Sequence, residues 1–291
     1  MLGGKNAMGK GDGPMQHHHA DLGDVRLHYV TEGSGFPVVL LHGWPQSWYE
    51  WRHIIPGLAE RFQVIAPDLR GLGDSSRPAG GYDKKTVGGD IWRLVHNVLG
   101  LSEFYLVGHD WGGPTAYAVA SAHPEAVRKL AILDVTIPGD GSPNISQGGR
   151  RWHHAFHQTL DLPEALIAGR EEIYFGWFYR NYGARPLDDG EIAEYLRTYR
   201  QPGALRAGFS YYRAIPADIA DNAAKVAAGF KLPMPVLALG GDRSWGRRME
   251  VVESLRRLAV DVRGGVIENC GHWMPEEQPE ALLGRLLEFF D

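Results

Sequence analysis

The chain has 291 residues, of which 44% are hydrophobic and 22% charged, a composition that is typical of globular proteins and sufficient for a buried core. Its formal net charge of −5, without any run of Lys and Arg, argues against nucleic acid as a partner. No apolar run is long enough to cross a bilayer, and the first twenty residues lack the hydrophobic stretch of a signal peptide. The single cysteine, Cys270, cannot form an intrachain disulfide. We therefore expect a cytoplasmic protein that does not bind membranes.

The N-terminal residues 1–20 are polar and rich in glycine, which predicts a disordered extension. This segment ends in three consecutive histidines, His17, His18 and His19, which could bind a metal weakly. A flexible histidine run without further ligands is more often incidental, so we expect no metal site there.

Beyond residue 20, short apolar runs alternate with amphipathic stretches, which is typical of a mostly parallel sheet with helices on both faces. The expected strands are 25–30, 37–41, 63–67, 104–107, 130–133, 236–239 and 265–268, and the expected helices are 86–99, 114–122, 249–258 and 279–290. Several of the strand runs are hydrophobic throughout, as expected for strands that are buried on both faces. The predicted fold class is therefore α/β.

Between residues 138 and 225 the composition changes, because strand patterns disappear and Trp, Phe and Tyr become frequent. This change predicts several helices inserted between two strands of the sheet. We expect residues 138–225 to form a helical cap, and residues 21–137 and 226–291 to form the α/β core. Most of the rings would pack the cap itself, and a few would face a dry pocket beneath it.

A candidate nucleophile lies where the expected strand 104–107 runs into Gly108-His109-Asp110-Trp111-Gly112-Gly113, before a helical pattern. This strand–turn–helix setting is one in which enzymes present a nucleophile on a tight turn, and the flanking glycines let the backbone pass close to its neighbours. An ionised carboxylate such as Asp110 needs no base to activate it. It can displace a leaving group from saturated carbon and form an ester on the enzyme. The alternative, an aspartate that only caps the next helix, is disfavoured by the motifs that accompany it.

Hydrolysis of such an ester requires a general base, for which His272 is the candidate. It follows the last expected strand and comes after the nucleophile in the chain, as the order of this kind of site requires. The acid that orients His272 is either Asp134 or Asp242, each of which follows an expected strand. We favour Asp134, because Asp242 sits in a short turn beside Arg243 and could simply pair with it.

Hydrolysis also requires a site for negative charge on the ester oxygen. The turn His42-Gly43-Trp44-Pro45, after the expected strand 37–41, suggests such an oxyanion hole. The backbone N–H groups of Trp44 and Trp111 would converge on the developing charge, and the two indole rings would wall the pocket.

Four segments resemble the α/β-hydrolase fold epoxide hydrolases. They are HGWPQSWYEWR (42–52), APDLRGLGDSS (66–76), GHDWGG (108–113) and CGHWMPEE (270–277). The likeness extends from about residue 20 to the C-terminus and includes the cap. Together the motifs are specific for the branch of the family that uses an Asp nucleophile, a branch that also holds the haloalkane and haloacetate dehalogenases.

The resemblance also identifies residues that would act on the leaving oxygen. In one bacterial subgroup a Trp-His pair lies early in the cap and a Tyr-Arg pair lies late in it, and here these are Trp152-His153 and Tyr212-Arg213. By that resemblance His153 and Tyr212 donate hydrogen bonds to the epoxide oxygen, because a phenol with a pKa of about 10 can stabilise or protonate it. The sequence leaves open whether Tyr212 or the adjacent Tyr211 faces the pocket.

The resemblance therefore implies an epoxide hydrolase, a monomer or homodimer that converts a small apolar epoxide and water into a vicinal diol without a metal or organic cofactor. The alternative is a haloalkane or haloacetate dehalogenase with the same Asp110 and His272. Fluoroacetate dehalogenases bind the substrate carboxylate with arginines just after the nucleophile, where this chain has Trp111 and Pro114. A third possibility, a small-molecule-binding protein without catalysis, is disfavoured because every expected catalytic residue type is present.

Overall fold

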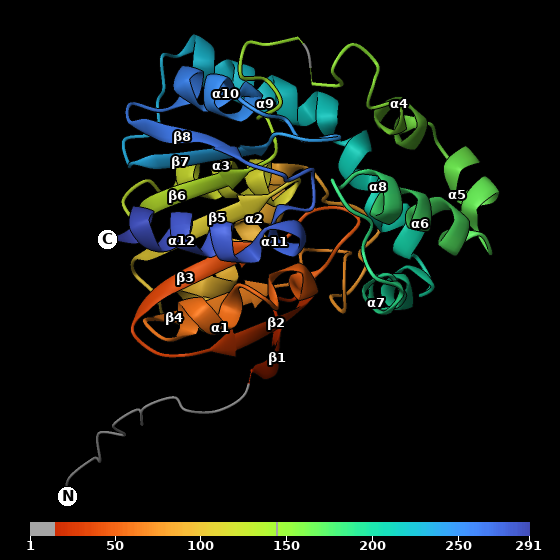
Figure 1. Cartoon of the computed structure of the whole chain (residues 1–291), viewed down its shortest axis with the longest axis horizontal. Coiled ribbons are helices and arrows are strands. Elements are labelled where there is room, and N and C mark those ends of the chain that lie inside the picture. Colours follow the sequence, from red (N-terminus) through yellow and green to blue (C-terminus); the bar gives the residue numbers. More distant parts are fainter. Residues whose placement is uncertain (1–14, 144) are drawn as a thin grey trace, which may run out of the picture.

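The computed structural model describes residues 15–143 and 145–291, which form one eight-stranded sheet with helices on both faces (Figure 1). The strands are β1 (Gln16–Asp21), β2 (Arg26–Glu32), β3 (Phe36–Leu41), β4 (Phe62–Pro67), β5 (Phe104–His109), β6 (Val127–Leu133), β7 (Val236–Gly241) and β8 (Val262–Ile267). Their order is β1-β2-β4-β3-β5-β6-β7-β8. The pairs β1–β2 and β2–β4 are antiparallel and the others parallel, so the predicted fold class is confirmed.

Side chains of successive residues in the central strands point alternately into two separate hydrophobic cores, one on each face of the sheet. On one face, residues such as Val39 and Leu41 pack with α2 (Lys84–Trp92), α3 (Gly112–Ala122) and α10 (Glu250–Leu258). On the other face, residues such as Val38 and Leu40 pack with α1 (Ile55–Ala59) and α12 (Pro279–Phe290). Both faces are buried, and this is why the strands read as continuous apolar runs in the sequence.

The remaining elements of the core are short. They are a 3-10 helix (Trp48–Trp51), a π-helical segment (Arg93–Val98) that continues α2, and α11 (Met274–Glu277). None of the helices in the described parts of the chain combines the length and apolar character that crossing a bilayer demands.

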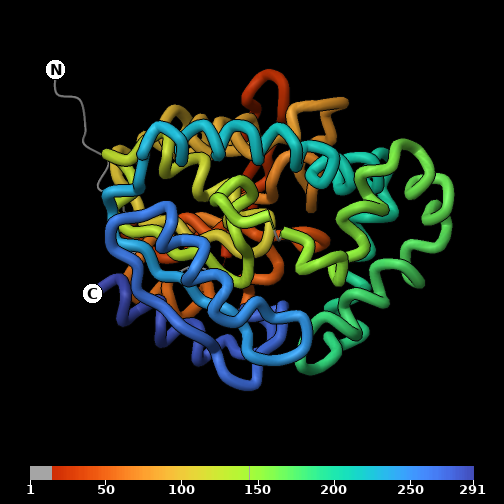
Figure 2. Tube along the Cα trace, turned by 90° about the horizontal axis from the view of Figure 1, so that it is seen from above, coloured from red at the N-terminus to blue at the C-terminus, as the bar shows by residue number. Residues whose placement is uncertain are grey.

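The described residues between β6 and β7 form six helices. They are α4 (His153–Gln158), α5 (Leu162–Ile167), α6 (Glu171–Asn181), α7 (Asp189–Tyr199), α8 (Ala204–Arg213) and α9 (Ile215–Ala227). In both views α4 to α8 gather at one end of the molecule, opposite the C-terminus (Figure 1, Figure 2). The Trp44 ring, in the loop after β3, lies 5.2 Å from the ring centroids of Phe178 on α6 and Tyr212 on α8. These helices therefore cover the carboxyl ends of the parallel strands, where α/β proteins bind ligands.

The structure differs from the sequence-based expectation at the N-terminus. Residues 16–20, which we assigned to a disordered extension, form most of the edge strand β1, which pairs with β2 from Gln16↔Thr31 to Asp21↔Arg26. The segment QHHHAD is mostly exposed and has no apolar run, so it carries no strand signal of its own. Pairing with β2 determines its conformation, as is common for strands. The rest of that predicted extension, residues 1–14, lies outside the described residues.

Candidate active site

The turn between β5 and α3 presents Asp110 at the carboxyl edge of the sheet. Asp110 has a φ of 45°, in the left-handed region that strains a residue other than glycine. Two glycines make this tight turn possible. A Cβ at Gly108 would lie 2.3 Å from the carbonyl oxygen of Gly112, and a Cβ at Gly112 would lie 2.2 Å from the carbonyl oxygen of Leu41. The strained residue is thus the one that the sequence singles out as the nucleophile.

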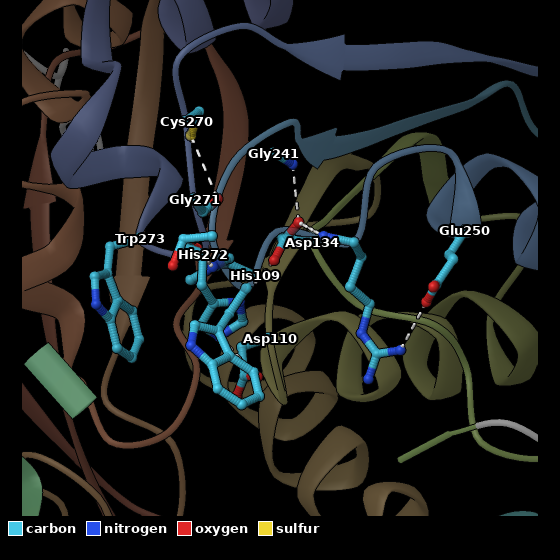
Figure 3. A network of polar contacts seen from close by, with 12 residues as sticks. His109, Asp110, Asp134, Gly241, Glu250, Cys270, Gly271, His272 and Trp273 are labelled. Atoms are coloured by element: carbon cyan, nitrogen blue, oxygen red, sulfur yellow. Dashed lines mark hydrogen bonds and ion pairs between the residues drawn. The ribbon is translucent and has the colours of Figure 1, made fainter. Parts of the chain in front are cut away.

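His272, in the loop after β8, lies between two carboxylates (Figure 3). Its Nε2 is 3.2 Å from Asp110 Oδ2, and its Nδ1 is 2.7 Å from Asp134 Oδ2. Asp134 follows β6 and is fully buried. Its second oxygen accepts the backbone N–H groups of Gly241 at 2.9 Å and Arg247 at 2.7 Å. Asp134 is therefore fixed by three hydrogen bonds and can hold the His272 ring in one orientation.

Asp242, the other candidate acid, makes different contacts. Its Oδ1 accepts the backbone N–H of Cys270 at 3.2 Å, and its Oδ2 lies 3.5 Å from Arg243 Nε. Asp242 thus holds the chain that leads to His272, while the imidazole itself bonds to Asp134.

Two backbone N–H groups point at the Asp110 carboxylate. Trp44 N donates to Asp110 Oδ1 at 3.0 Å, and the N–H of Trp111 also hydrogen-bonds this carboxylate. Burial by itself raises the pKa of Asp110, but the His272 hydrogen bond, the charge of His109 and the Trp111 N–H together hold it well below its usual value. Asp110 is therefore ionised at neutral pH, with Oδ1 accepting the Trp44 N–H and Oδ2 facing His272.

His109 and Glu50 form a buried pair beneath this site that the sequence analysis missed. Both side chains are fully buried, and His109 Nδ1 lies 3.2 Å from each Glu50 oxygen. Burial lowers the pKa of His109, but the Glu50 carboxylate outweighs it and raises that pKa to about 9. The other ring nitrogen donates to the His272 carbonyl oxygen at 2.8 Å. The pair thus places a positive charge next to Asp110 and holds the backbone of the base.

Helix α8 places Tyr212 against Trp44 and Trp111, the two residues whose N–H groups reach the Asp110 carboxylate. The Tyr212 ring is buried and packs edge-on against the Trp44 and Trp111 rings, with both pairs of centroids 5.2 Å apart. Tyr211 points away from them, because its hydroxyl donates to the Arg70 carbonyl oxygen at 2.9 Å. Of the two tyrosines, Tyr212 is therefore the one that faces the site. Burial, and next the Asp110 charge, raise its pKa well above 10, so the phenol keeps its proton.

His153 lies beside Tyr212, with ring centroids 5.5 Å apart, and is 3% exposed. Its Nδ1 is 2.9 Å from the Tyr182 hydroxyl, a partner that the sequence analysis did not identify. Burial and the neighbouring His154 and His157 lower the pKa of His153 far below its usual value. In a neutral ring whose Nδ1 accepts from Tyr182, the hydrogen is on Nε2, which is then a donor.

Two further histidines of α4 lie near Tyr212. The His157 ring lies 4.4 Å from that of Tyr212, and the His154 ring lies 5.4 Å from it. Burial first, and then the charge of Arg151, lower the pKa of His154 to about 3, and burial also depresses that of His157. All three histidines of α4 are therefore neutral, so the rings next to Tyr212 are polar but uncharged.

Elsewhere in the described residues, two groups of side chains have ligand atoms close enough to share a metal ion. They are His28, Asp68 and Asp74, and His53, Glu191 and Glu276. Neither group includes Asp110, Asp134 or His272.

Comparison with known proteins agrees with this arrangement. Residues 37–279 match a family described as alpha/beta hydrolase fold. A soluble epoxide hydrolase of Corynebacterium sp. (strain C12) is 43% identical over 284 residues, 94% of this chain and 96% of that protein. A fluoroacetate dehalogenase of Burkholderia sp. is 35% identical over 207 residues, 67% of each chain. The solved structure of the epoxide hydrolase CorEH without ligand is similar with a TM-score of 0.85 and 40% identity, covering 95% of this chain and 98% of that one.

Proposed function

The chain belongs to the α/β-hydrolase fold family, and we propose that it is an epoxide hydrolase that converts a small apolar epoxide and water into a vicinal diol. The observation that carries this proposal is the Asp110 carboxylate 3.2 Å from His272 Nε2, with the buried Tyr212 ring packed on Trp44 and Trp111 beside it. The 43% identity to a soluble epoxide hydrolase over nearly the whole of both chains supports it.

In the first step Asp110 Oδ2 attacks a ring carbon of the epoxide. A bond forms between this oxygen and the carbon, and the carbon–oxygen bond of the ring breaks. The ring oxygen gains charge, and we assign the donors that stabilise it to the Tyr212 hydroxyl and His153 Nε2. Tyr212 supplies the proton, because a phenol in a buried site is a good donor to an alkoxide. The product is a hydroxyalkyl ester on Asp110.

In the second step a water molecule attacks the ester carbonyl carbon, Asp110 Cγ. His272 Nε2 takes a proton from this water, and Asp134 stabilises the imidazolium that results. Negative charge develops on Oδ1, where the N–H groups of Trp44 and Trp111 act as the oxyanion hole. Breaking the bond from Cγ to Oδ2 releases the diol, which carries this oxygen away, and the water oxygen replaces it in the Asp110 carboxylate. The two protons of the water end on the diol oxygen and on Tyr212. We propose no role for a metal or organic cofactor in either step.

We propose that residues 138–225 serve as the cap that excludes water and supplies Tyr212 and His153. The packing of Trp44, Trp111 and the cap rings favours an apolar substrate. The single cysteine, which is buried and free, fits the cytoplasm as the location, and a monomer or homodimer stays a prediction.

Dehalogenation is the second candidate, because the chain is 35% identical to a fluoroacetate dehalogenase. An anionic haloacid needs a free positive charge near Asp110. Lys84 has its ammonium 4.4 Å from the centroid of the Trp111 ring, but this ammonium is held by Asp218 at 2.8 Å. Epoxides carry no charge and need no such partner, and this difference favours the epoxide hydrolase.

The experiment that tests the proposal is intact-mass measurement on His272→Gln, which lacks the base and should stall at the ester. The variant is exposed separately to a terminal aryl epoxide, a haloalkane and a haloacetate. We expect a mass gain equal to the whole epoxide, mapped to Asp110. The double variant with Asp110→Asn is the matched control and should gain no mass.

The other outcomes are distinct. A gain equal to the substrate minus halide would assign the protein to the dehalogenases. Binding of a small molecule without any adduct or turnover would favour a binding protein on this fold.

A further inference from the structure

Three histidines lie on one face of the β1–β2 hairpin. His17 and His19 are two residues apart on β1, so their side chains point to the same face. His28 on β2 pairs directly opposite His19. The His28 ring centroid lies 5.2 Å from that of His17 and 5.3 Å from that of His19. His18 points to the other face, where its Nε2 is 2.9 Å from Thr31 Oγ1.

A buried carboxylate behind His28 fixes where the lone pair of this ring points. Asp68 accepts the backbone N–H groups of Trp48 at 2.8 Å and Asp74 at 2.9 Å, and its Oδ2 lies 2.8 Å from His28 Nδ1. Nδ1 therefore carries the hydrogen that Asp68 accepts, and the lone pair of the ring is on Nε2. This lone pair faces His17, whose Nδ1 is 2.9 Å away. A carboxylate that accepts from the far nitrogen of an imidazole is the arrangement that orients histidine ligands in metal sites.

We propose that His17 and His28 form the core of a binding site for a divalent transition-metal ion, and that the exposed His19 side chain rotates toward the ion to become the third ligand. In a tetrahedral zinc site with Zn–N bonds of about 2.1 Å, two ligand nitrogens lie about 3.4 Å apart. The two nitrogens therefore separate by only about 0.5 Å to admit the ion. His17 lies on an exposed edge strand, where its side chain has room for this movement. The proton on His17 Nδ1 moves to Nε2 through solvent, so the ring stays neutral.

The charges and the ligand type determine which ions fit. The carboxylates of Asp68 and Asp74 belong to the same cluster as His28, with ligand atoms within 4.8 Å of one another, and they favour a cation. Imidazole ligands select Zn²⁺, Cu²⁺ and Ni²⁺ over Mg²⁺ and Ca²⁺.

A bound ion would tie the edge strand to the rest of the sheet. It would join β1 to β2 directly, and the Asp68 hydrogen bonds would extend this link to the loop after β4 and to Trp48. Because the unfolded chain does not hold these ligands together, binding stabilises the folded state in proportion to the logarithm of the free metal concentration.

The test is a calorimetric titration of Zn²⁺ into the metal-free protein, paired with thermal unfolding at increasing Zn²⁺. The chain offers matched variants: His17→Ala and His19→Ala change proposed ligands, and His18→Ala changes the neighbour that faces the other way. His53→Ala reports on the separate group formed with Glu191 and Glu276. All four side chains lie wholly or partly at the surface, so the variants should fold.

We expect one ion to bind per chain and the unfolding temperature to rise with Zn²⁺. His17→Ala should weaken binding at least about tenfold, since even changes behind a ligand cost ten- to a hundredfold. His18→Ala and His53→Ala should bind as the unchanged chain does. The proposal is overturned if Zn²⁺ does not bind at millimolar concentration, if His17→Ala binds equally well, or if His53→Ala abolishes binding. Unchanged binding by His19→Ala would remove His19 as the third ligand.

Discussion

The two walls of the candidate active site differ in how they handle charge. On the sheet side, Asp110, Asp134 and the His109–Glu50 pair bring several ionisable groups within hydrogen-bonding distance of one another or of His272. On the cap side, His153 and Tyr212 are held neutral by burial, among rings. The sheet side keeps its charges because each one has partners, whereas the cap side buries polar groups by keeping them uncharged.

This difference separates two chemical tasks. A nucleophile and a base need charge and a fixed orientation, and the carboxyl ends of a rigid parallel sheet provide both. A donor to a developing alkoxide needs a proton that it retains until the ring opens, and a dry aromatic cap provides this. Variants that change one wall at a time test the comparison.

The largest effect is expected on the sheet side, from Asp110→Asn. The amide is not a nucleophile, so the rate of diol formation should fall by at least about 10⁴-fold. Initial rates measured by chromatography of the diol check this. Activity should return only slowly, as hydrolysis of the amide regenerates Asp. Full and immediate turnover would show that Asp110 does not attack the substrate.

The next effect comes from the acid behind the base. Asp134→Asn removes the carboxylate that holds His272, and hydrolysis of the ester should slow by about 10³-fold, while the first step continues. Rapid-quench measurements should show the ester accumulating on the enzyme. Asp242→Asn is the matched control, because its carboxylate contacts the Cys270 N–H and Arg243 rather than the imidazole. If the rate of ester hydrolysis fell equally in Asp134→Asn and Asp242→Asn, Asp134 would not have the proposed role.

On the cap side, Tyr212→Phe should slow ester formation by about 10²-fold, because the ring oxygen loses its proton donor. The rate of the first step, measured under single-turnover conditions, should fall more than the rate of ester hydrolysis. Tyr211→Phe is the matched control. It should leave the first step unchanged and lower the free energy of unfolding by about 1 kcal/mol, because the hydrogen bond to the Arg70 carbonyl is lost. If Tyr211→Phe slowed the first step and Tyr212→Phe did not, Tyr211 would be the tyrosine that acts on the substrate.

The remaining effects are in stability against pH, and they have opposite signs for the two walls. The folded-state pKa of His109 is raised to about 9, so its stabilising contribution is complete below about pH 6.5 and is lost as the pH rises through 9. The loss amounts to about 3 kcal/mol at most. Urea unfolding between pH 6.5 and 9 should show this decline in the unchanged chain, and His109→Gln should abolish it. If the free energy of unfolding of His109→Gln fell with pH as steeply as that of the unchanged chain, His109 would not be charged in the folded protein.

The cap histidines act on the acid side. The pKa of His154 is lowered to about 3, and those of His153 and His157 are also depressed, so the stability that they contribute is complete above about pH 6.5 and is lost as the pH falls. Urea unfolding between pH 6.5 and 4 should show this decline, and His157→Phe should reduce it. If His157→Phe lost as much stability between pH 6.5 and 4 as the unchanged chain does, His157 would not be held neutral in the folded state.

The sequence alone determined the strands of the sheet other than β1, and the position of its functional turns. Strands buried on both faces leave continuous apolar runs, and the glycines around Asp110 mark a turn that only small residues permit. It also pointed to His272, because a histidine after the last strand returns to the same edge of the sheet as Asp110. These features are local in the chain, or follow from the order of parallel strands.

Only the tertiary structure decided which side chains meet across distant segments. Whether Asp134 or Asp242 bonds His272 depends on side-chain directions at the ends of two neighbouring strands, and the orientation of Tyr211 and Tyr212 depends on how α8 docks on the core. Glu50 lies 59 residues before His109, and nothing in the sequence around either residue predicts that the two side chains pair. The strand β1 follows the same rule, since a polar edge strand is specified by the backbone of its neighbour rather than by its own side chains.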